Sequence, residues 1–172
     1  MPQRILVTYA TWHESTAGVA RKVADVLKQR GADVDVERAA EVTDVSAYDA
    51  VVVGSAIRMG SMHGAARAFL SRHTFALASK QAALFVVCLS AMKDDEKSRA
   101  ETAELLKRAT GVVSGVTFLE TAAFAGGYDR SKAGLLVRFM FWAMRMGPGD
   151  FRDWDAIAAW AGTVADAFGV TA

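Results

Sequence analysis

Apolar residues along the chain follow two alternating patterns, one typical of buried strands and the other of amphipathic helices. Short and nearly continuous apolar runs predict strands that are covered on both faces of a sheet. The predicted strands are residues 4–9, 33–37, 50–54, 82–89 and 116–124. Between and after these runs, apolar residues repeat at helical spacing, which predicts helices over 16–30, 66–77, 94–110 and 154–168.

The run 33–37 differs from the other strands because charged and apolar residues alternate in it. This alternation predicts an edge strand with one face in water. Parallel strands need crossover helices, and such crossovers are right-handed. The chain is therefore predicted to be an α/β protein with a five-stranded parallel sheet in the order 2-1-3-4-5 and helices on both faces, forming three layers. In such a sheet the ligand lies beyond the carboxyl ends of the strands, here at the loops after the first and third strands.

Composition narrows the class of protein further. A length of 172 residues predicts a single domain over 1–172. The 20 Lys and Arg residues nearly balance 19 Asp and Glu residues, so no overall field favours nucleic acid as a partner. The single cysteine, Cys88, cannot form an internal disulfide, and the first residues do not resemble a signal peptide. We expect a cytoplasmic protein, with a peripheral position on the inner face of the cell membrane as an open alternative.

The loop after the first predicted strand, residues 8–16, is rich in hydroxyl groups and contains no Lys or Arg. The beginning of a helix offers backbone N–H groups and a partial positive charge, which can hold a phosphate without a cationic side chain. Thr11, Ser15 and Thr16 would add hydroxyl donors. The loop has neither a Walker A pattern nor G-x-G-x-x-G, so the phosphate of a mononucleotide fits it best. The alternative is that Ser15 or Thr16 serves only as the helix N-cap.

The loops after the third and fourth predicted strands are candidates for holding a planar ring. Small residues at the start of 54–63 would let the backbone approach the ring, and Met59 or Met62 could lie against it. The opposite wall would come from Trp12 or from residues 89–92. The alternative for 54–63 is an ordinary connection between a strand and a helix.

The first of these loops resembles the phosphate loop of the flavodoxin family. Tyr9, Thr11, Thr16 and Ala20 stand where that family has an aromatic residue, two hydroxyl residues and a small helical residue. Glu14 departs from the pattern, because the family usually has a small residue there and a carboxylate repels a phosphate unless it points to solvent or pairs with a cation. The resemblance implies a flavodoxin-like fold with FMN as cofactor.

A second stretch, residues 48–60 with His63 and Phe69-Leu70, resembles the menaquinone-dependent protoporphyrinogen dehydrogenase branch of that family. Residues 147–160 resemble the same branch, whereas 126–150 carry the weakest likeness. This resemblance implies an FMN-dependent oxidoreductase of haem biosynthesis, with a quinone as electron acceptor and protoporphyrinogen as donor. Arg58 would pair with a substrate carboxylate or the pyrimidine edge of the flavin, or else form a surface ion pair. His63 is expected to begin a helix rather than to relay a proton.

The two loops and the resemblance together predict a set of cofactor contacts and name no catalytic side chain and no metal ligand. The predicted contacts are Thr11, Trp12, His13, Ser15, Thr16, Ser55, Ala56, Ile57, Arg58, Met59, Gly60, Leu89, Ser90 and Ala91.

The segment 131–146 is apolar on almost every helical face, and residues 129–146 carry a net charge of +3. A cationic helix with aromatic residues can lie on an anionic membrane surface. Packing on the chain's own sheet, or on a second subunit in a homodimer, would also cover it. All three alternatives remain open from the sequence.

Four other functions compete with the quinone-linked enzyme. A flavodoxin-type electron carrier ranks second because such carriers have a strongly acidic face, whereas this chain has a net charge of +1. Another FMN-dependent quinone reductase is a further alternative. A receiver domain is rejected because Thr8 and Gly54 stand where acidic residues would be needed. Glu14 keeps open a domain that has lost its flavin.

Overall fold

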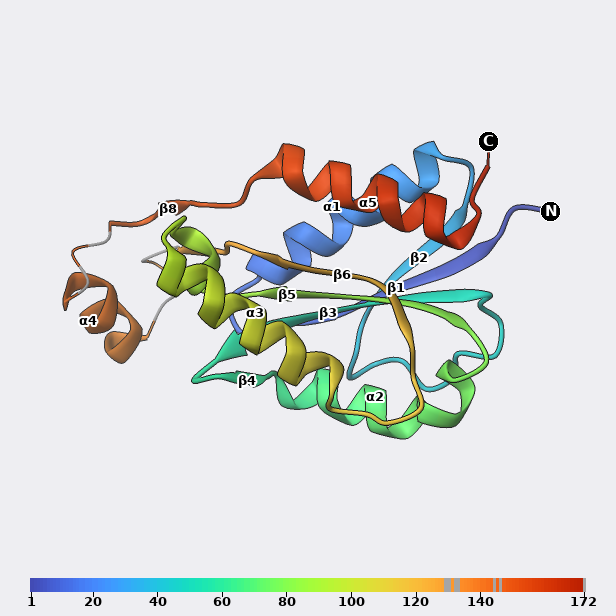
Figure 1. Ribbon diagram of the computed structural model, residues 1–172, viewed down its shortest axis with the longest axis horizontal. Coiled ribbons are helices and arrows are strands. Elements are labelled where there is room, and N and C mark those ends of the chain that lie inside the picture. Colours follow the sequence, from blue (N-terminus) through green and yellow to red (C-terminus); the bar gives the residue numbers. More distant parts are fainter. Residues whose placement is uncertain (129–130, 132–133, 144, 146, 172) are drawn as a thin grey trace.

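The computed structural model describes residues 1–128, 131, 134–143, 145 and 147–171. Five parallel strands form its main sheet in the order β2-β1-β3-β5-β6 (Figure 1). Their bounds are β1 Arg4–Ala10, β2 Asp33–Arg38, β3 Ala50–Arg58, β5 Gln81–Val87 and β6 Phe118–Phe124. They are the five predicted strands in the predicted order, so the flavodoxin-like α/β class is confirmed.

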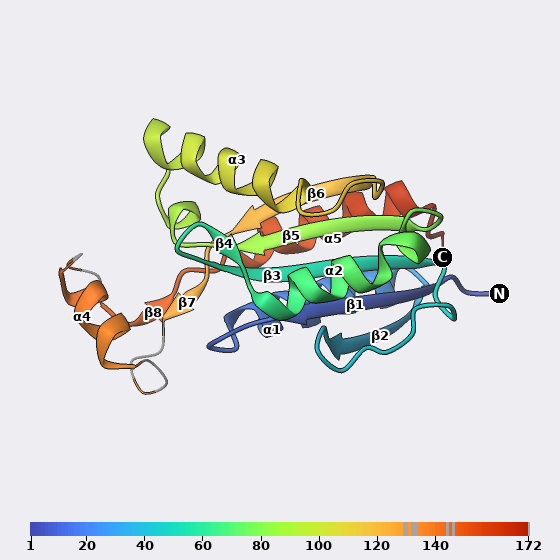
Figure 2. The ribbon, with the colours of Figure 1, turned by 90° about the horizontal axis from the view of Figure 1, so that it is seen from below.

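Helices cover both faces of the sheet (Figures 1 and 2). Helices α1 (Ser15–Gln29) and α5 (Trp154–Phe168) lie on one face, and α2 (Gly64–Leu77) and α3 (Glu96–Thr110) on the other. Successive strand residues point to opposite faces. In β1, Ile5 and Val7 therefore join the core beneath α1 and α5, while Leu6 joins the core above α2. Two separate cores explain why this strand is continuously apolar.

Strand β2 is the edge strand that the alternating pattern predicts. Val34 is buried, while Asp33 and Asp35 are accessible and form ion pairs with Arg4 of β1 at 3.5 and 3.3 Å. The charged positions therefore face water, and the apolar position faces the core.

Strand β3 continues to Arg58, beyond the end at Gly54 that the sequence predicts. Its last two residues pair with β4 (Ser61–Met62), an antiparallel partner joined to it by the two-residue turn Met59-Gly60. Both turn residues have a positive φ, 50° and 75°, as a tight hairpin turn of this type requires. The segment 55–58 is thus strand rather than loop, because Ser55 and Ala56 still pair with the main sheet and the hairpin pairs Ile57 and Arg58.

Two helices begin at an aspartate that caps them. Asp95 and Asp153 accept hydrogen bonds from the backbone N–H groups of Ser98 and Ala156, which begins α3 and α5. Asp150, three residues before the cap of α5, instead pairs with Arg152.

A small subdomain lies beyond the carboxyl end of the main sheet, at the end of the molecule opposite both termini (Figures 1 and 2). It contains β7 (Gly127–Tyr128) paired with β8 (Gly149–Asp150), and helix α4 (Leu135–Ala143) between them. The helix predicted over 131–146 is therefore shorter than expected, and its positions 132, 133, 144 and 146 lie outside the described residues. Among the helices of the described residues, none is both long enough and apolar enough to span a bilayer.

Candidate functional site

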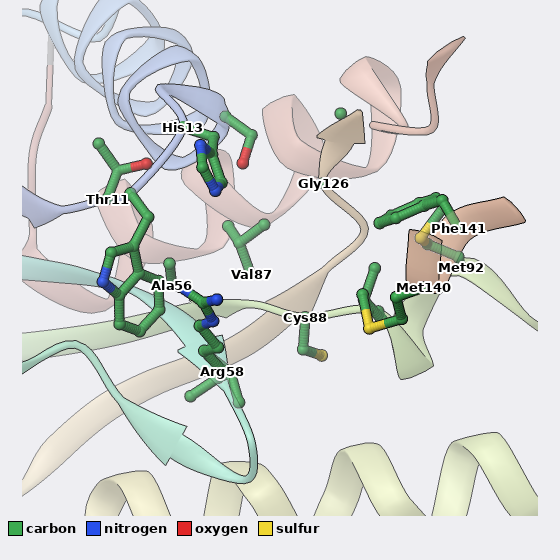
Figure 3. Close-up of a pocket in the computed structure, with 15 residues that line it drawn as sticks. Thr11, His13, Ala56, Arg58, Val87, Cys88, Met92, Gly126, Met140 and Phe141 are labelled. Atoms are coloured by element: carbon green, nitrogen blue, oxygen red, sulfur yellow. The ribbon is translucent and has the colours of Figure 1, made fainter. Parts of the chain in front are cut away.

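A pocket lies where β1, β3 and β5 end, at the edge of the sheet predicted from the topology. Figure 3 shows Thr11 and His13 on one side of it and Met140 and Phe141, from α4, on the other. The lining residues are Thr11, Trp12, His13, Ser15, Ala56, Ile57, Arg58, Val87, Cys88, Leu89, Met92, Gly126, Gly127, Met140 and Phe141.

Eight of the predicted cofactor contacts line this pocket and six do not. Those that line it are Thr11, Trp12, His13, Ser15, Ala56, Ile57, Arg58 and Leu89. Those outside the lining are Thr16, Ser55, Met59, Gly60, Ser90 and Ala91.

Helix α1 begins at the pocket without a capping side chain. Its N-cap is Glu14, with φ 64°, and no side chain accepts a hydrogen bond there. Neither Ser15 nor Thr16 is the cap, so the capping alternative is not what the structure has. The first N–H groups of a helix lack intrahelical partners, and here no side chain replaces them. This helix end is open to an anion.

Two hydroxyl groups beside this helix end are buried and unsatisfied. The Oγ1 atoms of Thr11 and Thr16 have no hydrogen-bond partner within the described part of the chain. Leaving a buried hydroxyl without a partner costs free energy, so such an atom points to a missing partner. Thr16 does not line the pocket itself, but it directly follows Ser15, which does. The threonines therefore fit an anionic ligand placed at the start of α1.

The Glu14 carboxylate is held by a cation. Its Oε1 atom lies 2.5 Å from the Nη2 atom of Arg38, at the end of β2. The Arg38 guanidinium in turn lies over the ring of Tyr9, 5.6 Å from its centroid. The carboxylate that departs from the flavodoxin pattern is therefore neutralised by an ion pair. The positive φ of the Glu14 backbone also explains why the flavodoxin family usually has a small residue at this position.

A second cation reaches the same helix from the far end of the sequence. Arg152 donates a hydrogen bond from Nη1 to the carbonyl oxygen of Ser15 at 3.3 Å, and it stacks on Trp154 at 4.5 Å. Its hydrogen bonds with Asp150 hold the pKa of that carboxyl below its usual value. A Cβ atom on Gly18 would lie 2.4 Å from Nη1, so glycine at this position admits the arginine. Arg152 could not be found from the sequence, because no local pattern links it to Ser15, 137 positions away.

The small residues at the end of β3 serve the core as well as the pocket. A Cβ atom on Gly54 would lie 2.2 Å from Cζ of the buried Phe85, so this glycine makes room for the phenylalanine and not for a ligand. The Ser55 hydroxyl is buried too, accepting from the N–H of His63 and donating to the carbonyl of Ala56. Of residues 54–58, only Ala56, Ile57 and Arg58 line the pocket.

The hairpin after β3 keeps both candidate methionines away from the pocket. Met59 stands at the turn and is 97% exposed, and Gly60 beside it completes the turn. Met62 is buried in the core above α2. Neither sulfur therefore lies at the pocket.

Trp12 forms one wall of the pocket with two neighbours. The guanidinium of Arg58 lies 5.8 Å from its ring centroid, and the His63 ring lies 4.4 Å from it. His63 is the N-cap of α2, where its Nδ1 atom accepts a hydrogen bond from the N–H of Ala65. Burial lowers the pKa of His63, so the ring is neutral near pH 7. The expectation that His63 begins a helix is confirmed.

The segment after β5 turns into a short 3₁₀ helix, Ser90–Met92, that redirects its side chains. The Ser90 hydroxyl accepts a hydrogen bond from Thr102 of α3 at 2.8 Å and contacts the Cys88 sulfur at 3.4 Å. Ser90 is therefore committed to holding α3, while Leu89 and Met92 face the pocket.

Seven lining residues were not among the predicted contacts. They are Val87, Cys88, Met92, Gly126, Gly127, Met140 and Phe141. Val87 and Cys88 could have been found, because the carboxyl end of a central strand adjoins the ligand in this kind of sheet. Gly126 allows a close approach, since a Cβ atom there would lie 3.1 Å from Cγ1 of Val87 and 3.3 Å from the Ser15 hydroxyl oxygen. No local signal places Met140 or Phe141 there.

The arrangement combines an anion site at one end with a largely apolar slot beside it. Within the described ranges, no cluster of His, Cys, Asp or Glu is arranged to hold a metal ion. A phosphate on the helix start and a flat ring between the β3 end, Trp12 and Leu89 would use both features.

Comparisons with known proteins agree with this geometry. A family model described as a flavodoxin domain matches residues 6–155. Protoporphyrinogen IX dehydrogenase (quinone) of Escherichia coli strain K12 is 30% identical over 97 residues, covering 55% of this chain and 54% of that protein. The chain thus matches about half the length of this curated relative.

Solved structures resemble the whole fold at low identity. Oxidised flavodoxin 2 from Bacillus cereus has a TM-score of 0.63 and 16% identity, and the match covers 95% of this chain and 98% of that one. A flavoprotein from Lactobacillus acidophilus NCFM, solved in complex with FMN, has a TM-score of 0.51 and 13% identity, over 72% of this chain and 93% of that one. At such identities the likeness concerns the fold alone.

Proposed function

Because the chain belongs to the flavodoxin domain family, we propose that it binds FMN in this pocket and is an FMN-dependent oxidoreductase. The observation that carries the proposal is the pair of buried hydroxyls on Thr11 and Thr16, which lack partners beside an uncapped helix start. A phosphate group would satisfy both hydroxyls and the open N–H groups together.

The remaining pocket residues suit the flavin ring. The backbone of Ala56, Ile57 and Arg58 forms one edge of the slot, and Trp12 and Leu89 supply apolar walls. Arg58 has no acidic partner among the described residues, so its charge is available to the electron-rich edge of the ring or to a substrate carboxylate. Bound FMN would accept electrons from a reduced substrate and pass them to an acceptor, while the protein supplies position and electrostatics.

The specific reaction proposed is quinone-linked oxidation of protoporphyrinogen IX to protoporphyrin IX. The partial match to the Escherichia coli dehydrogenase supports it, as does the mainly apolar wall that α4 adds to the pocket. A porphyrinogen loses six electrons and six protons when it becomes a porphyrin. Complete conversion of one porphyrinogen therefore consumes three quinones and yields three quinols. Arg58 beside the apolar wall fits a substrate that combines carboxylates with a large apolar ring.

The first experiment tests the cofactor. Purified protein should be yellow, and heat should release a flavin that co-migrates with FMN rather than FAD. Apo-protein should regain the spectrum with FMN, whereas Thr16→Val should bind FMN more weakly. Colourless protein that gives no heat on titration with FMN would remove the redox assignment.

The second experiment tests the reaction. Under anaerobic conditions the holoprotein should convert protoporphyrinogen IX to a fluorescent porphyrin only when a menaquinone analogue is present. Arg58→Ala should raise KM for the porphyrinogen more than it lowers kcat. If the quinone is reduced by another donor and the porphyrinogen is untouched, the protein is a different FMN-dependent quinone reductase.

A further inference from the structure

Helix α4 has two sides with different surroundings. Met140 and Phe141 line the pocket, and Phe141 is only 5% exposed. The outer side is accessible, with Leu135 81%, Leu136 73%, Phe139 62% and Trp142 73% exposed. Figures 1 and 2 show the helix beyond the end of the sheet, so none of the described helices or strands of the main sheet's layers covers this side.

The exposed side chains form one continuous stripe. At about 100° per residue in an α-helix, Trp142, Leu135, Phe139 and Leu136 fall within an arc of roughly 120°. Single exposed apolar residues are ordinary, as with Phe75 on α2, but a contiguous apolar patch marks an interaction surface.

Positive charge is concentrated around the same helix. Arg138 lies next to the stripe on the helix surface, and Arg145 follows the helix; both are exposed. Residues 129–146 carry +3, and because the whole chain is +1, all other residues together carry −2. A surface that combines apolar, aromatic and cationic groups complements an anionic lipid interface.

We propose that the outer face of α4 docks the protein on an anionic phospholipid bilayer. Leu135, Leu136, Phe139 and Trp142 enter the interfacial region, and Arg138 and Arg145 contact lipid phosphates. A second copy of the chain fits this surface less well, because a two-fold interface would bring two segments of charge +3 together.

Docking in this way sets the pocket beside the bilayer. The helix that contacts lipid with one side lines the pocket with the other through Met140 and Phe141. This consequence rests on the proposed function: a lipid-soluble quinone would reach the pocket along α4 without crossing bulk water.

Vesicle co-sedimentation of the FMN-loaded protein tests the proposal. The protein should sediment with vesicles of phosphatidylcholine and phosphatidylglycerol, more weakly with phosphatidylcholine alone, and less as salt is raised. The double variants F139S/W142S and R138E/R145E should each bind anionic vesicles at least about tenfold more weakly. Brominated lipids should quench the fluorescence of wild-type protein more than that of W142F.

Matched controls separate this surface from general effects. Phe75→Ser removes an even more exposed aromatic residue from α2, and R21E/R67E makes the same change of charge on α1 and α2. Both control variants should bind vesicles like the wild type.

Three results would overturn the proposal. The first is absence of vesicle binding, and the second is equal loss in the α4 variants and the controls. The third is a dimer in light scattering that F139S/W142S converts to a monomer without any vesicle binding, which would mean that a second copy covers the face. Flavin content is measured on every variant, so protein that binds vesicles but not FMN would contradict the proposed function alone.

Discussion

Two walls of one pocket are built in opposite ways. The wall from β1, β3 and β5 is the end of a sheet whose side chains are buried on both faces. The wall from α4 belongs to a small subdomain held by a two-strand pairing, and most of its apolar side chains face outward. Apolar residues predominate in both segments, yet only in the sheet do they form a core. An apolar segment therefore indicates a surface that avoids water, but the topology of the fold determines whether other parts of the chain cover that surface.

The largest difference between the two walls should appear in stability. Phe85→Ala removes a fully buried ring that packs on Gly54 and should lower the free energy of unfolding by about 3–5 kcal/mol. Phe139→Ala, on the exposed side of α4, should change it by no more than about 0.5 kcal/mol. Urea denaturation of the two variants measures both. A large loss in Phe139→Ala would mean that α4 is packed against protein in solution.

The second difference concerns the ligand. Thr16→Val preserves shape but removes a buried hydroxyl without a partner, so it should leave stability unchanged while weakening FMN binding. A hydrogen bond to a charged phosphate contributes about 1.5–3 kcal/mol, which corresponds to roughly 10- to 150-fold in Kd. Calorimetry measures the affinity, with Thr163→Val on the exposed side of α5 as control. An unchanged Kd would show that the phosphate does not use this hydroxyl.

A smaller effect on FMN affinity is expected from the ion pair between Arg38 and Glu14 at the start of α1. Arg38→Ala leaves the Glu14 carboxylate without its cation, so FMN binding should weaken by about fivefold, or roughly 1 kcal/mol. Glu14→Gln in the Arg38→Ala background should restore most of the affinity, because the repulsive charge is gone. If the double variant binds FMN as weakly as Arg38→Ala does, Arg38 contributes to FMN binding directly and not through Glu14.

The smallest effect is a pH dependence at His63. Burial lowers its pKa in the folded protein, so the unfolded chain binds more protons near the ordinary pKa of 6.5. Stability should therefore fall as pH drops through 6.5 toward the lowered pKa, and this contribution should be absent in His63→Asn, which keeps an N-cap acceptor. Urea midpoints of both proteins between pH 5 and pH 8 supply the comparison. Urea midpoints that change with pH in the same way in both proteins would contradict a contribution from His63.

What could be predicted from the sequence follows from how local each signal is. Continuous apolar runs and the alternation in 33–37 give the strands and the edge, and the strand order then locates the pocket. Contacts between distant segments could not be predicted in this way. The arginine at 152 reaches Ser15, and Phe85 requires Gly54, only because the sheet brings them together. The position of Phe141 in the pocket wall depends on how a whole subdomain turns back toward the sheet.

The turn at Met59-Gly60 could not be predicted from the pattern of apolar and polar residues either. Small residues after Val53 predict a loop, whereas pairing with β1 and β5 keeps them in a strand that the Met59-Gly60 hairpin then extends to Arg58. The departure at Glu14 could be recognised from the sequence, but its resolution by Arg38 could not, because β2 approaches the loop only in the folded sheet.

Titration of the apo-protein with FMN and with riboflavin tests most directly whether a phosphate sits at the start of α1. The two ligands share the ring and differ in the phosphate. Two charge-assisted contacts predict that FMN binds about a hundredfold or more tightly than riboflavin, with the gap narrowed in Thr16→Val. Equal affinity for the two ligands, or no binding of FMN, would contradict the account.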